Sequence, residues 1–255
     1  MLTLSLQSGS NGNSIYVEAG CQRILFDGGL SARRAQERLS GFGRDLQGCT
    51  ALFISHDHSD HVRSAGPLHR RFGMPLYITE PTLQAAHRSV RLGNLSDVRH
   101  FRAGATVELG SVRIHTVPTP HDAADGVAFV VEHGGRRLGI LTDLGHPFPG
   151  LSELLAGLDG AYLESNYDPD LLETGAYPPF LKARIRGGRG HLSNQQSAFL
   201  AHAGAAGRLR WLAIAHLSQD NNRPAMAIEA HRLQLGREFP IHHASRHGPG
   251  PIIEL

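Results

Sequence analysis

The sequence predicts an α/β protein of the αββα sandwich class, in which two mixed β-sheets pack face to face with helices outside. Strand-like segments dominate two successive parts of the chain, and helical segments follow each of them. No linker, low-complexity tract or block of charge divides the sequence. Residues that can bind metals directly follow several of the apolar strands. We therefore expect one α/β domain that spans residues 1–255.

The composition argues for metal chemistry and against a membrane protein. The net charge is only +2, so charge alone neither favours nor excludes a nucleic-acid partner. The 17 histidines suggest metal ligands, and the 30 glycines suggest sharp loops at strand ends. The two cysteines form no CxxC pair, so a reducing, cytoplasmic location is expected. No apolar run is long enough to span a bilayer, and the alternating N-terminus is typical of a strand rather than a signal peptide.

The first part of the chain opens as a β-meander. Alternating apolar and polar residues predict strands over Leu2–Gln7, Ile15–Val17 and Gln22–Phe26. The turn at residues 8–14 is either a plain hairpin loop or the rim of a functional site. Asp27 follows the third strand, as an ordinary turn residue or as a partner that orients a ligand histidine. Ser31 is a suitable N-cap for a helix from Ala32 to about Ser40.

The densest polar cluster follows the buried-type strand Ala51–Ile54. Residues Ser55 to His61 include three histidines and two aspartates. Neutral imidazole and carboxylate are ligands that Zn, Mn and Fe accept from proteins. A solvated histidine-rich turn is the alternative interpretation. A helix from His61 to about Phe72 should follow, with apolar residues at helical spacing.

Strands and helices then alternate to the end of the chain. A strand at Leu76–Thr79 leads into a helix at Glu80–Ser89. Three strands form a second meander, over Val98–Phe101, Ala105–Leu109 and Val112–Val117. Later strands are expected over Val127–Glu132, Arg136–Leu141, Gly160–Leu163 and Arg210–Ile214. Two further helices should run from about Gly190 to Ala203 and from about Asn221 to Leu235.

Three later strands are each followed by one further residue that can bind a metal. These residues are His121, Asp143 and His216, although each is also compatible with an ordinary loop position. With the first cluster they make seven ligands, which suit two ions about 3.5–4 Å apart that share a carboxylate. We assign one ion to His56, His58 and His121, the other to Asp60, His61 and His216, and the bridge to Asp143.

Two divalent ions, with Zn or Mn favoured over Fe, would hold a water or hydroxide between them as a nucleophile. The cations would stabilise the charge that develops during attack on an ester or phosphodiester. Asp60 is a second candidate catalytic group, because its carboxylate can accept the proton of the nucleophile.

This pattern, His56-x-His58-x-Asp60-His61 with three ligands downstream, resembles the metallo-β-lactamase superfamily over essentially the whole chain. The resemblance implies the αββα fold. The stretch Gly190 to Asn194, followed by His216-Leu217-Ser218, is similar to the paired histidine motifs of the ribonuclease Z family. That similarity implies that His216 is a ligand and that His191 assists proton transfer at the scissile phosphate.

The chain most resembles the small bacterial YycJ/WalJ-like group. The resemblance lies in residues 8–14, 55–61, 142–145, 164–166, 181–185, 190–194, 216–218 and 221–222. It implies a metal-dependent exonuclease that acts on DNA ends, with single-stranded ends expected. Tyr167 stands where the group has histidine, and neither the Arg-Tyr pair of ribonuclease Z nor a long tRNA-gripping arm is present.

The expected substrate contacts lie in polar loops and in the basic stretch of residues 177–190, which is equally consistent with a solvated helix face. They are Ser10, Asn11, Asn13, Asn166, Lys182, Arg184, Asn194 and Asn222. The alternative function is a metal-dependent hydrolase of a small-molecule thioester, lactone or cyclic phosphodiester, because related ligand sets serve several chemistries. A binding module that keeps metal without turnover is a third interpretation.

Overall fold

The computed structural model describes all 255 residues, and the chain divides into two compact units. The first unit contains Met1–Pro118, Ala123–Val127 and Ser245–Glu254. The second contains Thr119–Asp122, Ala128–Ala244 and Leu255. The expectation of a single domain over residues 1–255 stays a prediction.

The first unit is built on a seven-stranded sheet with the order β14-β1-β2-β3-β4-β5-β6. The strands are β1 Leu2–Gln7, β2 Ser14–Ala19, β3 Gln22–Phe26, β4 Ala51–Phe53, β5 Leu76–Ile78, β6 Val98–His100 and β14 Ile253–Glu254. Strands β1, β2 and β3 are antiparallel, which confirms the predicted opening meander. From β3 to β6 the neighbouring strands are parallel.

The predicted second meander is wrong in one strand. Strand β6 pairs in parallel with β5 and therefore belongs to the first sheet. Only β7 (Thr106–Leu109) and β8 (Val112–Pro118) form the expected antiparallel hairpin. The alternation of apolar and polar residues predicts a strand but carries no information about which neighbour it pairs with.

The helices of the first unit cover one face of its sheet. They are α1 Ala32–Ser40, α2 Ser59–Val62, α3 Ala65–Phe72 and α4 Glu80–Ser89, with a short 3-10 turn at Leu46–Gly48. The side chain of Ser31 accepts a hydrogen bond from the Arg34 amide, which confirms the predicted N-cap. Leu39 and Leu68 join the buried apolar core against Leu52 of β4. This core makes β4 a rigid support for the loop that follows it.

The predicted helix from His61 to Phe72 is interrupted, and α2 and α3 replace it. Pro67 lies in the first turn of α3, and in a continuous helix its ring would clash with the carbonyl of Arg63. The break frees backbone groups that contact the end of β3. Gly28 donates its N–H to the carbonyl of His61 (2.6 Å), and Ser64 donates to the carbonyl of Gly28 (2.8 Å).

The second unit contains the strands β13-β12-β11-β10-β9 as neighbours in that order. Their bounds are β9 Val127–His133, β10 Arg136–Leu141, β11 Gly160–Glu164, β12 Trp211–Ala215 and β13 Ile241–His243. Strands β9 and β10 form the predicted hairpin, and β10 to β13 are parallel. Because parallel strands run in one direction, the residues that follow β10, β11 and β12 meet at the same edge.

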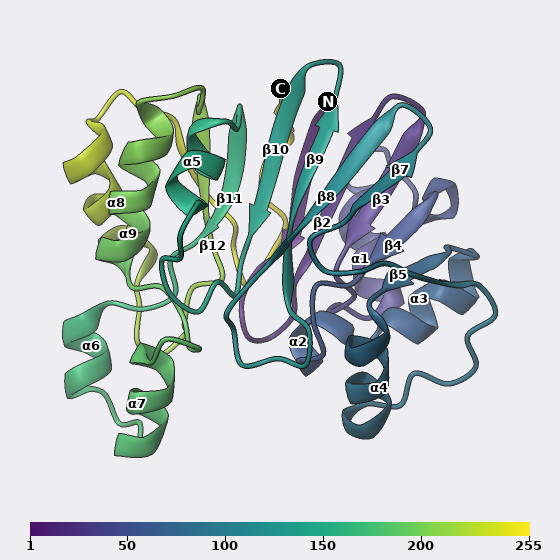
Figure 1. Cartoon of the computed structure of the whole chain (residues 1–255), viewed down its shortest axis with the longest axis horizontal. Coiled ribbons are helices and arrows are strands. Elements are labelled where there is room, and N and C mark those ends of the chain that lie inside the picture. Colours follow the sequence, from purple (N-terminus) through teal and green to yellow (C-terminus); the bar gives the residue numbers. More distant parts are fainter. The chain divides into compact units, whose positions relative to one another are not determined.

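The helices of the second unit form two groups. They are α5 Leu151–Ala156, α6 Pro169–Thr174, α7 Pro179–Arg186, α8 Asn194–Ala205 and α9 Pro224–Leu235. Figure 1 shows α5, α8 and α9 alongside β11 and β12, whereas α6 and α7 form a separate pair beyond the ends of these strands. Ser193 caps α8 through a capping box with Gln196. None of the helices is long and apolar enough to cross a membrane.

Candidate metal centre

The ligand-rich loop of the first unit is fixed by Asp27 at the end of the neighbouring strand β3. The parallel register pairs Phe26 with Phe53, which places Asp27 beside the loop that follows β4. The Asp27 carboxylate accepts hydrogen bonds from the Ser55 amide (2.8 Å), from Ser55 Oγ (3.0 Å) and from His61 Nδ1 (2.7 Å). Because Nδ1 of His61 donates its proton here, Nε2 carries the lone pair that can bind a cation.

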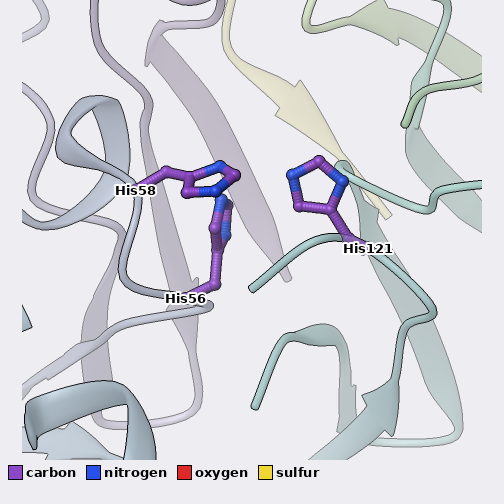
Figure 2. A group of neighbouring side chains, drawn as sticks. All are labelled: His56, His58 and His121. Carbon is purple, nitrogen blue, oxygen red and sulfur yellow. The ribbon is translucent and has the colours of Figure 1, made fainter. Parts of the chain in front are cut away.

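The loop brings its three imidazoles together. The rings of His56 and His58 meet edge-on, with centroids 4.7 Å apart, and His56 and His61 are 4.1 Å apart. Asp60 Oδ2 lies 3.4 Å from His61 Nε2. Figure 2 shows His56 and His58 extending from the same loop after β4. The predicted ligands of the first unit therefore form one cluster of nitrogen and oxygen donors.

Asn13 joins the loop at residues 8–14 to this cluster. Its Nδ2 donates to Asp60 Oδ2 (3.1 Å) and lies 2.9 Å from His61 Nε2. Its Oδ1 accepts from the Gly9 amide (2.8 Å), and the side chain is buried. Ser10 is exposed, whereas Asn11 donates its amide to the carbonyl of Arg246. The rim position of this loop was one of the two predicted alternatives, and its contacts favour it over a plain hairpin loop.

In the second unit, Asp143 lies between two histidines. Asp143 Oδ1 is 3.7 Å from His121 Nε2 and 3.6 Å from His216 Nε2. His121 donates its Nδ1 proton to the carbonyl of Gly190 (2.8 Å), so its lone pair is on Nε2. Asn166 donates to the carbonyl of His216 (2.8 Å) and lies 3.2 Å from its Nδ1. Both histidines thus direct Nε2 toward the same carboxylate oxygen.

Glu164 is a site residue that the sequence interpretation missed. It is the last residue of β11 and is fully buried. Its Oε2 accepts from the Leu144 amide (2.9 Å), and its Oε1 accepts from His191 Nδ1 (2.5 Å). A carboxylate at the end of an apolar strand was a visible signal, because Asp143 was found in the same way. The bond fixes the orientation of the His191 ring, whose side chain is 19% exposed beside buried neighbours.

Buried amides hold the loops that carry these residues. Asn222 donates to the carbonyls of Ser165 (2.9 Å) and Asn166 (3.0 Å) and to Asn194 Oδ1 (2.9 Å). Asn194 also accepts from Ser165 Oγ at 2.7 Å. Their predicted contact with substrate stays a prediction. The observed bonds place Asn166, Asn194 and Asn222 as supports of the strand-end loops, because buried amide groups require such partners.

Arg184 and Lys182 lie on α7 and differ in their partners. Arg184 Nε donates to Asp122 Oδ2 at 2.6 Å, and this hydrogen bond raises the pKa of the guanidinium. Lys182 donates its ammonium to the carbonyl of Glu173 on α6. Arg184 therefore contacts the residue next to His121, whereas Lys182 fastens α7 to α6.

The donors of both units suit divalent cations such as Zn, Mn or Fe, since they are imidazoles and carboxylates without a thiolate. In the second unit, Asp143, Glu164, His191 and His216 offer donor atoms within 4.8 Å of one another. Glu164 and His191 are already bonded to each other, so Asp143 and His216 are the direct ligand candidates there. The residues present therefore fit the metal that the sequence pattern predicts.

Comparison with known proteins identifies the class of this chain. Residues 22–216 match the Beta-lactamase superfamily domain. The chain therefore belongs to the metallo-β-lactamase superfamily and is a metal-dependent hydrolase. A solved structure of the metallo-beta-lactamase fold protein YhfI from Bacillus subtilis covers 100% of both chains, with a TM-score of 0.76 and 14% identity. This match confirms the predicted αββα fold class.

Within the superfamily, the chain is a member of the WalJ-like group that the sequence pattern indicated. It is 32% identical to the Exodeoxyribonuclease WalJ of Streptococcus pneumoniae, over 98% of this chain and 96% of that one. It is also 30% identical to the Ribonuclease Z of Mycolicibacterium paratuberculosis, over 64% of this chain and 66% of that one. The second match confirms the predicted relation to the ribonuclease Z branch.

Proposed function

We propose that this protein is a dinuclear metal-dependent phosphodiesterase that removes nucleotides from DNA ends, preferentially single-stranded ones. The observation that carries the proposal is the 2.5 Å hydrogen bond between Glu164 and His191, beside Asp143. Cleavage of a phosphodiester releases an alkoxide, which needs a proton in the transition state. A thioester releases a thiolate, which needs none at neutral pH. A fixed imidazole beside the metal ligands therefore favours a substrate with an alkoxide leaving group, such as a phosphodiester, over a thioester.

The proposed ligands are those that the sequence indicates. His56, His58 and His121 would hold one ion, while Asp60, His61 and His216 would hold the other. Asp143 would serve both, which is supported by its similar distances of 3.7 and 3.6 Å to His121 and His216. When bound, two divalent ions, Zn or Mn in preference to Fe, would supply positive charge and an acidified water.

The remaining chemistry is proton transfer, which we assign to two side chains. We assign to the carboxylate of Asp60 the role of accepting the proton of the attacking water, and its hydrogen bond from the amide of Asn13 supports this assignment. Glu164 keeps a proton on Nδ1 of His191 and stabilises the ring when Nε2 carries a second one. Nε2 of His191 is then the atom that passes a proton to the departing oxygen of the DNA strand.

The nucleic-acid substrate is supported by the relatives and by the basic segment. The Streptococcus pneumoniae relative is named an exodeoxyribonuclease, and it aligns over nearly its full length. Lys182, Arg184, Arg186 and Arg189 place four cationic side chains within eight residues, directly before His191. Such clustering attracts a polyanion by neutralising phosphates. A cytoplasmic location remains part of this proposal.

The test is a comparison of purified wild type with Asp60→Ala and His191→Ala, each loaded with Mn²⁺ or Zn²⁺. End-labelled single-stranded DNA, duplex DNA and RNA are supplied as substrates, together with a thioester and a lactone. We expect nucleotide release from single-stranded DNA, its loss in Asp60→Ala, and a loss of about 10²–10⁴-fold in His191→Ala. Elemental analysis should find two ions per chain. Release of no nucleotide from any DNA or RNA contradicts the proposal. Turnover of the lactone, or turnover of the thioester that is insensitive to His191→Ala, supports the alternative hydrolase.

A further inference from the structure

Helix α7 carries an aromatic side chain that the fold of the second unit does not use. None of the residues of α7 is buried, and Phe180 is 75% exposed. The helix belongs to the α6–α7 pair, which lies beyond the ends of β11 and β12 (Figure 1). A single exposed phenylalanine is common on protein surfaces. This ring, however, lies on a helix that also carries Lys182, Arg184 and Arg186, and the combination of an aromatic ring with cations points to a ligand.

The two faces of α7 have different tasks. Lys182 and Arg186 are four residues apart and share one face. Both contact Glu173 of α6, Lys182 at the backbone carbonyl and Arg186 at the carboxylate, so this face fastens the helix. Phe180 and Arg184 are also four residues apart and lie about 200° around the helix from the first pair. The exposed ring therefore lies on the face opposite the one that fastens α7 to α6.

The face with Phe180 leads to the candidate site. Arg184 on this face donates to Asp122, the neighbour of His121, at 2.6 Å. The guanidinium keeps its two terminal nitrogens for other partners, and the side chain is 55% exposed. The end of α7 also joins the catalytic candidate directly, since His191 donates its N–H to the carbonyl of Ile185 at 3.0 Å. A ligand that binds to this face of α7 would therefore extend to the candidate site.

We propose that Phe180 is a stacking platform for a base of single-stranded DNA, with Arg184 beside it to contact the backbone phosphate. This inference rests on the proposed nuclease function. The combination of an aromatic ring and cations favours single-stranded nucleic acid as the ligand. The ring can stack on a base, and the cations can contact the phosphates that alternate with the bases along a strand. Single strands are selected because the faces of the bases are accessible only where they are unstacked. The platform deepens the proposed function, since it explains a preference for single-stranded ends.

The matched variants are Phe180→Ala, Phe180→Trp and Phe199→Ala. Phe199 lies on α8 and is 68% exposed, so its removal controls for the loss of any exposed phenylalanine. The metal-loaded enzymes are compared by KM for a single-stranded oligonucleotide and by turnover of bis(4-nitrophenyl) phosphate, which has no base. Phe180→Trp adds an exposed indole to a chain whose one natural tryptophan, Trp211, is buried. Titration with a phosphorothioate-linked oligonucleotide then reports stacking by fluorescence quenching.

We expect Phe180→Ala to raise KM for the oligonucleotide by roughly 5- to 150-fold, the range for loss of one base stacked on an aromatic ring. Phe180→Trp should retain a low KM, and the oligonucleotide should quench its indole fluorescence. The KM of Phe199→Ala should match that of wild type. All three should hydrolyse the small diester as wild type does. Wild-type cleavage of DNA with an unchanged KM in Phe180→Ala, or an equal loss in Phe199→Ala, overturns the platform and leaves the nuclease proposal standing. A wild type that cleaves no DNA overturns the nuclease proposal itself.

Discussion

Glu164→Gln removes one acceptor from a buried carboxylate that serves two donors. Oε2 of Glu164 accepts from the Leu144 amide at 2.9 Å, and Oε1 accepts from His191 at 2.5 Å. The glutamine side chain has one carbonyl oxygen and an NH₂ group, so it can satisfy only one of these donors. An unsatisfied buried donor costs about 1–3 kcal/mol. We therefore expect the free energy of unfolding to fall by about that amount, with a cooperative transition retained.

The effect on activity depends on the leaving group. Without the carboxylate, the His191 ring loses its partner at Nδ1 and its support when Nε2 is protonated. For a natural DNA linkage, which releases an alkoxide, we expect kcat to fall by roughly 10²–10⁴-fold. For thymidine 5′-(4-nitrophenyl phosphate), which releases a stable phenolate that needs no proton, the loss should be about tenfold or less.

The assay measures kcat for both substrates with wild type, Glu164→Gln and Glu153→Gln. Glu153 is an exposed carboxylate on α5 and controls for the general effect of lost charge. Metal content is measured for each sample, so that a loss of ions is not mistaken for a loss of proton transfer. Equal losses on the two substrates at full metal content would refute the assignment of Glu164 and His191 to leaving-group protonation.

Two further predictions concern metal binding and pH. Asn13→Ala removes the amide that orients the Asp60 carboxylate, and we expect the affinity for Zn²⁺ measured by titration to fall about 10–100-fold. Asn11→Ala is the control, and equal affinities would exclude an orienting role. His231 is fully buried, with Nδ1 bonded to the carbonyl of Ala227 and Nε2 to Ser197. Burial lowers its pKa below the ordinary histidine value of about 6.5, so the unfolded chain binds more protons than the folded one. The free energy of unfolding measured in urea should consequently decrease as pH falls below about 6.5. His231→Gln should reduce this dependence of the free energy on pH, and an unchanged dependence would contradict this account.

The strands of the chain could be predicted because half-buried strands alternate with a period of two. The bounds of β1 and β3 agree with the predicted segments, and the hairpin of β7 and β8 was also found. Pairing was harder, since β6 proved to extend the first sheet. The short helices α5 and α6 were not predicted, because each has six residues and too few turns for an apolar stripe.

The candidate site could be predicted where chemistry and position coincide in the sequence. His121, Asp143 and His216 each follow an apolar strand, and the second unit brings all three together. The supporting contacts could not be predicted, because they join residues far apart in the chain. Asn13 and Asp60 are separated by 47 positions, and Asn166 and His216 by 50. Only the folded backbone reveals that these amides hold a neighbouring ligand.

The backbone is strained at three strand ends, and the supporting contacts hold two of these residues in their conformation. Asp27, Asp143 and His216 are the non-glycine residues with positive φ, at 65°, 56° and 53°. Such a conformation costs about 1–3 kcal/mol and persists only where surrounding bonds determine it. Asp27 is held by three bonds to its carboxylate and by its own amide, which donates to Phe53 at 2.8 Å. His216 is held by Asn166 at its carbonyl. Glycine would relieve the strain at each position but would remove the side chain, so the cost marks the places where chemistry, rather than stability, decides the residue.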